Sequence, residues 1–124
     1  MVFSILIVDD SKSARHLIKR ELLSIITDKE VVFTEGANGK EAVDRCLKNT
    51  YDLIFLDLTM PDMTGYDVLE TLKKHGLKTK AIVLSADIQP GVAEIVKGSG
   101  AIGFCKKPFS HDSIVALLRE NDLL

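Results

Sequence analysis

Five short apolar runs alternate with longer stretches of mixed polarity along the whole chain. The runs lie at residues 5–8, 31–33, 53–56, 81–84 and 101–105. Each run is continuous rather than alternating in polarity and is rich in β-branched or aromatic residues, which is typical of strands buried on both faces of a parallel sheet. The pattern therefore predicts five parallel strands, with a helix after each.

The stretches between these runs repeat apolar residues at intervals of three and four, the spacing of one helix face. The apolar stripes expected to pack on the sheet are Ala14, Leu17, Ile18, Leu22 and Ile25 in the first helix, Ala42, Val43, Cys46 and Leu47 in the second, Leu69 and Leu72 in the third, and Ile114, Leu117 and Leu118 in the last. Asn38 and Ser110 are suited to cap the second and last helices, and Phe109 and Ile114 are spaced for a hydrophobic staple. We expect the third helix over 65–76 and a short fourth helix from Pro90 to Gly98.

Five β/α units favour a single α/β domain over residues 1–124, with a doubly wound parallel sheet covered by helices on both faces. The length of 124 residues suits one domain, and 46% hydrophobic with 27% charged residues is ordinary globular composition. The net charge of −2, with no block of like charges, argues against direct nucleic-acid binding. No apolar run is long enough for a membrane span.

The cysteines do not indicate a disulfide framework or a metal site. Cys46 and Cys105 are the two cysteines of the chain, and neither lies in a CxxC or Cys/His spacing. We expect both to be reduced and buried, and the protein to be cytoplasmic.

Conspicuous polar residues follow four of the five predicted strands. They are Asp9 and Asp10 after the first strand, Asp57 after the third, Ser85 after the fourth, and Lys106 and Lys107 followed by Pro108 after the fifth. Carboxyl ends of parallel strands meet at one edge, where doubly wound sheets bind their ligands. Clustered carboxylates share protons or hold a cation, and hard oxygen ligands with room for water suit Mg²⁺. A lysine and a hydroxyl nearby complete the requirements of phosphoryl transfer, with a carboxylate as nucleophile because Ser85 has no evident base.

Four segments in this order resemble the receiver domain of bacterial response regulators. They are ILIVDDS at 5–11, DLTMPDMTG at 57–65, LSA at 84–86 and KPF at 107–109. The resemblance covers essentially the whole chain, and it implies a flavodoxin-like fold with strand order 2-1-3-4-5. It also implies a phosphoacceptor that phosphorylates and dephosphorylates itself, rather than a turnover enzyme.

The resemblance assigns a role to each matching residue. Asp57 would be the phosphorylated aspartate, Asp10 a direct Mg²⁺ ligand, and Asp9 a ligand acting mainly through water; Asp57 and the backbone carbonyl of Thr59 would complete the metal site. Lys107, preceding a cis bond to Pro108, and Ser85 would bind the phosphoryl group, with Ala86 allowing close approach of the loop and Phe104 turning inward as the switch aromatic. Thr59 and Asp87 would tune dephosphorylation.

The implied cofactor is Mg²⁺, with Mn²⁺ as a substitute, and the implied phosphodonor is a histidine kinase or a phosphotransfer protein. A downstream target protein would bind the face formed by the fourth helix, fifth strand and fifth helix. Phe104 stands where flagellar-motor-binding receivers usually have tyrosine, which weakens the case for a motor switch. A chemotaxis regulator and a phosphorelay intermediate are the two hypotheses for the output. A receiver-like interaction module that takes no phosphate, and the receiver portion of a larger regulator, also remain open.

Two other classes with this architecture fit the residues less well. A flavodoxin needs a phosphate-cradling loop after the first strand, where this chain has carboxylates that repel phosphate. A haloacid-dehalogenase-type phosphatase needs a second Asp two residues after the first, and those places hold Ser11 and Lys12. His16, His75 and His111 lie away from the acidic residues, so we expect them to be solvated or to cap helices.

Overall fold

The predicted sheet is present, with all five strands parallel. The computed structural model describes residues 2–77, 79–86 and 91–124. Its elements are β1 (Val2–Val8), α1 (Lys12–Ile25), β2 (Glu30–Gly36), α2 (Gly39–Lys48), β3 (Leu53–Asp57), α3 (Gly65–Lys74), β4 (Ala81–Ser85), α4 (Val92–Gly98), β5 (Gly103–Lys106) and α5 (His111–Glu120). The strand order is β2-β1-β3-β4-β5, which confirms the flavodoxin-like α/β fold.

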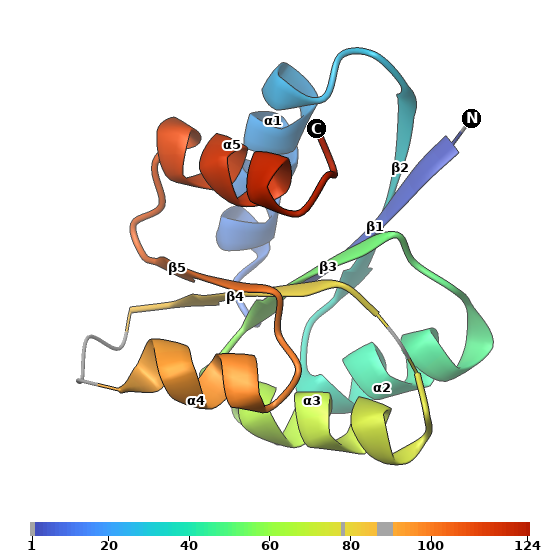
Figure 1. The fold of residues 1–124 in the computed structure, drawn as a ribbon. Helices are drawn as coiled ribbons and strands as arrows, with labels where there is room; N and C mark the ends of the chain where they lie inside the picture. The colour runs from blue at the N-terminus through green and yellow to red at the C-terminus, as the bar shows by residue number, and fades with distance from the viewer. Residues whose placement is uncertain (1, 78, 87–90) are drawn as a thin grey trace.

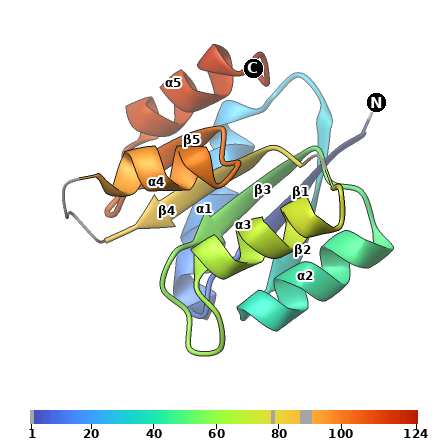
Figure 2. The same ribbon diagram turned by 60° about the horizontal axis from the view of Figure 1, so that its bottom comes forward.

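Helices cover both faces of the sheet, so the core has two layers. Helices α1 and α5 lie on one face, and α2, α3 and α4 lie side by side on the other (Figures 1 and 2). Alternate residues of the central strands point into opposite layers: Ile54 and Leu56 toward α2–α4, and Leu53 and Phe55 toward α1 and α5. Every residue of β3 and β4 is buried, which explains why their sequences are continuously apolar.

Three strands differ from the predicted bounds by more than one residue at an end. β1 begins at Val2 rather than at residue 5. β2 extends from Glu30 to Gly36 and is an edge strand, so its outer polar positions reach water and broke the apolar pattern. β5 begins at Gly103 rather than at residue 101, because the amide of Ala101 donates to the carbonyl of Val96 and closes the end of α4.

Two residues predicted to pack on the sheet are exposed. Leu17 of α1 has 53% of its surface exposed and Leu47 of α2 has 50%, because each lies at the margin of its helix stripe. Ile18 and Cys46, one residue away on the respective helices, are the buried contacts instead. The prediction for these two leucines was wrong: helical spacing identifies the face but not its width.

The predicted caps are present. The Asn38 side chain accepts from the Glu41 amide, and Ser110 forms a capping box with Ser113. Phe109 packs against the same layer as Ile114. The fourth helix is described from Val92, and the predicted start at Pro90 lies outside the described residues. No helix in the described part of the chain is both long and apolar enough to cross a membrane.

Candidate functional site

Three carboxylates meet at the carboxyl edge of the sheet. Asp9 and Asp10 follow β1 directly, and Asp57 is the last residue of β3, the strand paired with β1. One oxygen of each carboxylate lies within 4.8 Å of the others. Asp9 is 1% exposed and Asp57 is 6% exposed, whereas Asp10 is exposed to solvent. The site is therefore buried on the side of Asp9 and Asp57 and open to solvent on the side of Asp10.

Lys107 brings a positive charge to this cluster from the end of β5. Its Nζ lies 2.8 Å from Asp9 Oδ2 and 3.5 Å from Asp57 Oδ1. The backbone amide of Lys107 donates to the carbonyl of Ser85, 2.8 Å away, which joins the ends of β4 and β5. The Lys107–Pro108 peptide bond is cis, as the resemblance implies.

The charges of the cluster shift the protonation of its members. Burial raises the pKa of Asp57, and the nearby charge of Asp9 raises it further, against the opposing effects of Lys107 and the Thr59 amide. Burial alone would lower the pKa of Lys107, but its contact with Asp9 and the charge of Asp57 outweigh burial, and its pKa is raised. Lys107 therefore stays charged near neutral pH. Its single positive charge faces two buried carboxylates, those of Asp9 and Asp57.

The loop after Asp57 is held close to the strand that precedes it. The Thr59 amide points to Asp57 Oδ1 at 3.4 Å, and the Gly65 amide donates to the Leu58 carbonyl at 2.8 Å. A side chain at Gly65 would place its Cβ 2.9 Å from the Asp57 carbonyl oxygen, closer than real contacts allow. Gly65 is therefore required for α3 to start this near the site.

Asp62, later in the same loop, binds the first two residues of α2. Its two oxygens accept from the amides of Gly39 and Lys40 at 3.0 and 2.9 Å. These backbone donors hold the pKa of Asp62 below its usual range. This contact could not be predicted from a carboxylate at a turn alone, because its partners are over twenty residues away.

The other described residues of the predicted site lie on or just after β3, β4 and β5. Ser85 is buried at the end of β4, Ala86 is exposed after it, and Thr59 is exposed two residues after β3. Phe104 is half-buried and packs against the core layer of α2, α3 and α4. Asp87 lies outside the described residues. Lys106 is exposed, in agreement with its interpretation as a solvated residue.

The histidines lie apart from the cluster. His16 is exposed on α1, and His75 is the C-cap of α3, with Nδ1 2.9 Å from the Thr71 carbonyl. His111 starts α5 and pairs with Glu21 of α1, with 2.5 Å between Nδ1 and Oε1. His111 thus has a side-chain partner that helical periodicity did not predict.

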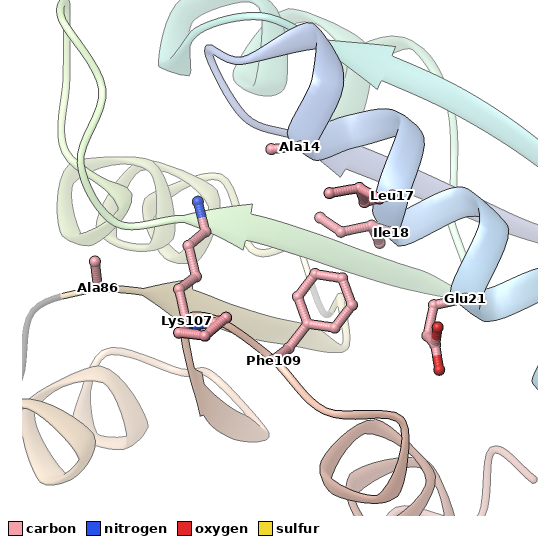
Figure 3. Close-up of a pocket in the computed structure, with 8 residues that line it drawn as sticks. Ala14, Leu17, Ile18, Glu21, Ala86, Lys107 and Phe109 are labelled. Atoms are coloured by element: carbon pink, nitrogen blue, oxygen red, sulfur yellow. The ribbon is translucent and has the colours of Figure 1, made fainter.

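An apolar groove of about 510 Å³ opens beside Lys107. Leu17 and Ile18 of α1 form one wall and Phe109 the other, with Ala86 and the Lys107 stem at one end (Figure 3). Leu17, exposed at the margin of the apolar stripe of α1, is accessible on this wall. The groove thus puts an accessible apolar surface next to the charged cluster.

The donor set suits a hard divalent cation. Carboxylate oxygens on one open side, with a backbone carbonyl at Thr59 nearby in sequence, are the ligands that Mg²⁺ prefers. Asp9 already accepts from the Ser11 amide at 2.9 Å and from Lys107, so fewer of its lone pairs are available to a metal. Exposed Asp10 and partly paired Asp57 are the better direct ligands.

Comparison with known proteins gives the class that this fold and site define. Residues 5–119 match the response regulator receiver domain family. The chain belongs to this family, and it is a two-component receiver whose acidic phosphorylation site is formed by Asp9, Asp10 and Asp57. Such domains are phosphoacceptors rather than turnover enzymes.

Individual relatives agree with this class. The chain is similar to the cell cycle response regulator CtrA of Brucella ovis, with 37% identity over 114 residues, 90% of this chain and 46% of the relative. It therefore spans about half the length of the curated relatives it matches. Among solved structures, the Francisella response regulator 1452 receiver domain has 31% identity and a TM-score of 0.83, covering 97% of this chain and 94% of that one. The chemotaxis protein CheY4 of Vibrio cholerae has 28% identity and a TM-score of 0.79, covering 97% and 98%.

Proposed function

We propose that Asp57 accepts a phosphoryl group from the phosphohistidine of a histidine kinase or phosphotransfer protein. A carboxylate oxygen of Asp57 forms the new bond to phosphorus, and the phosphorus–nitrogen bond of the donor breaks. The observation that carries this proposal is the placement of Asp57, buried beside Asp9 and 3.5 Å from the Lys107 ammonium. An ionised, fixed carboxylate beside a cation is the arrangement that phosphoryl transfer requires.

We assign Mg²⁺ to Asp10, Asp57 and the Thr59 carbonyl, with Asp9 acting mainly through water and Mn²⁺ as a substitute. When bound, the cation neutralises charge on the transferred phosphoryl oxygens. Lys107 supplies a second positive charge from the end of β5 and is already paired with both buried aspartates. Asp9 orients Lys107 through the 2.8 Å contact and keeps its pKa raised.

The response to phosphorylation would pass through Ser85 and Phe104. A phosphoryl group adds negative charge and three acceptor oxygens, which attract Lys107 and the Ser85 hydroxyl. Ala86 would leave room for the chain after β4 to approach the phosphoryl group. Half-buried Phe104 would then turn into the space that Ser85 vacates. The face of α4, β5 and α5 would then change shape and bind a downstream protein. Thr59 and Asp87 would set how readily water reaches the phosphoryl group.

The groove beside Lys107 supports contact with a protein phosphodonor. Its apolar walls, including the 53% exposed Leu17, lie next to the acceptor site. A helix of the donor seated there would hold its phosphohistidine near Asp57. Leu17→Glu is therefore expected to slow transfer from a phosphorylated kinase domain while leaving reaction with acetyl phosphate unchanged. Equal effects on both donors would argue against this contact.

The intact mass of the purified chain after incubation with acetyl phosphate, with Mg²⁺ or with EDTA, tests the acceptor. We expect a gain of one phosphoryl group only with Mg²⁺, no gain in Asp57→Asn, and a normal gain in Asp62→Asn. Asp62 is a suitable control because it is a nearby carboxylate bonded to α2 rather than to the cluster.

A second candidate function is an interaction module that binds its partner without phosphorylation. No gain of mass in the wild-type chain with either acetyl phosphate or a phosphorylated kinase would favour it. Because the chain spans 46% of the relative CtrA, it could also act as the receiver portion of a larger regulator. Chemotaxis and phosphorelay are the two pathways that we propose for a stand-alone receiver.

A further inference from the structure

Asp9 is held at each of its polar atoms. Its amide donates to the Gly36 carbonyl at 3.1 Å, Oδ1 accepts from the Ser11 amide at 2.9 Å, and Oδ2 accepts from Lys107 at 2.8 Å. Its backbone carbonyl accepts from Nη1 of Arg15 at 2.6 Å. Ser11, Gly36 and Lys107 lie at or just after strand ends at the carboxyl edge of the sheet, whereas Arg15 reaches Asp9 from the first turn of α1.

Arg15 is itself held in one orientation. Its Nε donates to Oε1 of Glu35 at 3.0 Å, and its side chain is only 13% exposed. Glu35 precedes Gly36 on β2, and its second oxygen accepts from Lys19 at 2.9 Å. Its backbone carbonyl accepts from Arg45 Nε at 2.5 Å. The guanidinium of Arg15 therefore spans from a fixed carboxylate to the carbonyl of Asp9.

The peptide group between Asp9 and Asp10 transmits this contact to the site. A peptide group is planar, so fixing the Asp9 carbonyl also fixes the direction of the Asp10 amide nitrogen. That direction decides where the Asp10 carboxylate starts, and Asp10 is the exposed carboxylate on the open side of the cluster. Without the Arg15 contact, the Asp9 carbonyl and the peptide that leads to Asp10 are held less firmly, because β1 ends before them at Val8.

We propose that Arg15, oriented by Glu35, is a positioning residue that fixes the Asp9–Asp10 peptide and so sets the cation affinity of the acidic site. The inference rests on the proposed function in one respect, that the cation is Mg²⁺. Arginine is required because one planar guanidinium donates to two acceptors at a fixed separation, and a lysine ammonium cannot reproduce that fork.

The test compares Arg15→Lys with Lys19→Met in the full chain. Arg15→Lys keeps the charge and removes the fork, while Lys19→Met removes the other ion pair of Glu35 without touching Asp9. Titration calorimetry with MgCl₂ should show about tenfold weaker binding in Arg15→Lys, as expected for loss of an outer-shell partner, and a change within about twofold in Lys19→Met. Phosphorylation by acetyl phosphate should recover in Arg15→Lys at saturating Mg²⁺, because the acceptor itself is intact.

The amide resonance of Asp10 in metal-free protein gives a readout independent of Mg²⁺. Its nitrogen shares a peptide group with the Asp9 carbonyl, so Arg15→Lys should shift it and Lys19→Met should leave it in place. An unchanged Asp10 resonance in Arg15→Lys, or equal losses of Mg²⁺ affinity in both variants, would overturn the inference. If the wild-type chain binds no Mg²⁺, the proposed function fails, and the Asp10 resonance still decides the role of Arg15.

Discussion

The two ends of β3 each carry an aspartate, and the protein holds the two in different ways. At the amino end, exposed Asp52 accepts from the amide and the hydroxyl of Ser4, at 2.8 and 3.2 Å. At the carboxyl end, Asp57 is buried beside Asp9, and the two share the ammonium of Lys107. At the amino end the carboxylate is satisfied by hydrogen bonds from Ser4 of β1, whereas the carboxyl end keeps like charges together. The difference indicates that the amino end serves stability and the carboxyl end serves chemistry.

Removing the Lys107 ammonium that Asp9 and Asp57 share should have the largest effect on stability. Lys107→Ala would leave Asp9 and Asp57 buried without a counter-charge, at a cost of about 3 kcal/mol, the low end for a broken buried pair because the lysine is partly exposed. Urea unfolding in EDTA measures this cost. Lys106→Ala, one residue away and exposed, should stay within about 0.5 kcal/mol of wild type. Equal stabilities of the two variants would mean that Lys107 does not balance the cluster.

Crowding at the carboxyl end should have the next largest effect. In Gly65→Ala the new Cβ would meet the Asp57 carbonyl oxygen at 2.9 Å and Leu58 Cα at 3.0 Å, so the backbone must shift. We expect a loss of about 2 kcal/mol and slower phosphorylation of Asp57. Gly98→Ala is the matched control, since nothing lies within 4 Å of its Cβ position. Thermal unfolding of both variants decides the point, and a neutral Gly65→Ala would show that the loop is not tightly packed.

Removing the carboxylate at the amino end should lower the stability of the chain by a smaller amount. Asp52→Ala loses the two hydrogen bonds from Ser4 and should destabilise the chain by about 1 kcal/mol. Phosphorylation by acetyl phosphate should be unchanged, because the residue lies at the other end of the sheet. A loss of phosphorylation in this variant would contradict the division between the two ends.

The smallest predicted effect concerns pH and has opposite signs for two carboxylates. The raised pKa of Asp57 means that its charge opposes folding near neutral pH, and this opposition disappears as the pH falls below the ordinary carboxyl range near 4. Contacts with Lys19 and Arg15 hold the pKa of Glu35 below its usual value, so its stabilising contribution is present near neutral pH and is lost as the pH falls through that lowered pKa. In urea unfolding at pH 7, Asp57→Asn should be more stable than wild type and Glu35→Gln less stable. Both differences should shrink as the pH is lowered to 3. Differences of the same sign at pH 7 would disprove the assignment.

Much of the fold was predictable because it depends on local pattern. The central strands are apolar throughout since both of their faces are covered, and the parallel order brings Asp9, Asp57 and Lys107 to one edge. The edge strand β2 was predicted too short because water reaches one of its sides. The contacts of Arg15 with Glu35 were not predictable, since they join residues twenty positions apart whose pairing depends on how α1 lies on β2.

The central claim is that the carboxyl end keeps an unfavourable charge arrangement that a bound cation relieves. The most direct measurement is the free energy of unfolding of wild type and Asp57→Asn by urea at pH 7, in EDTA and in Mg²⁺. We predict that Asp57→Asn is more stable than wild type in EDTA, by on the order of 1 kcal/mol, and that Mg²⁺ stabilises wild type by more than the variant. A variant less stable than wild type in EDTA, or equal stabilisation of both proteins by Mg²⁺, would contradict the account.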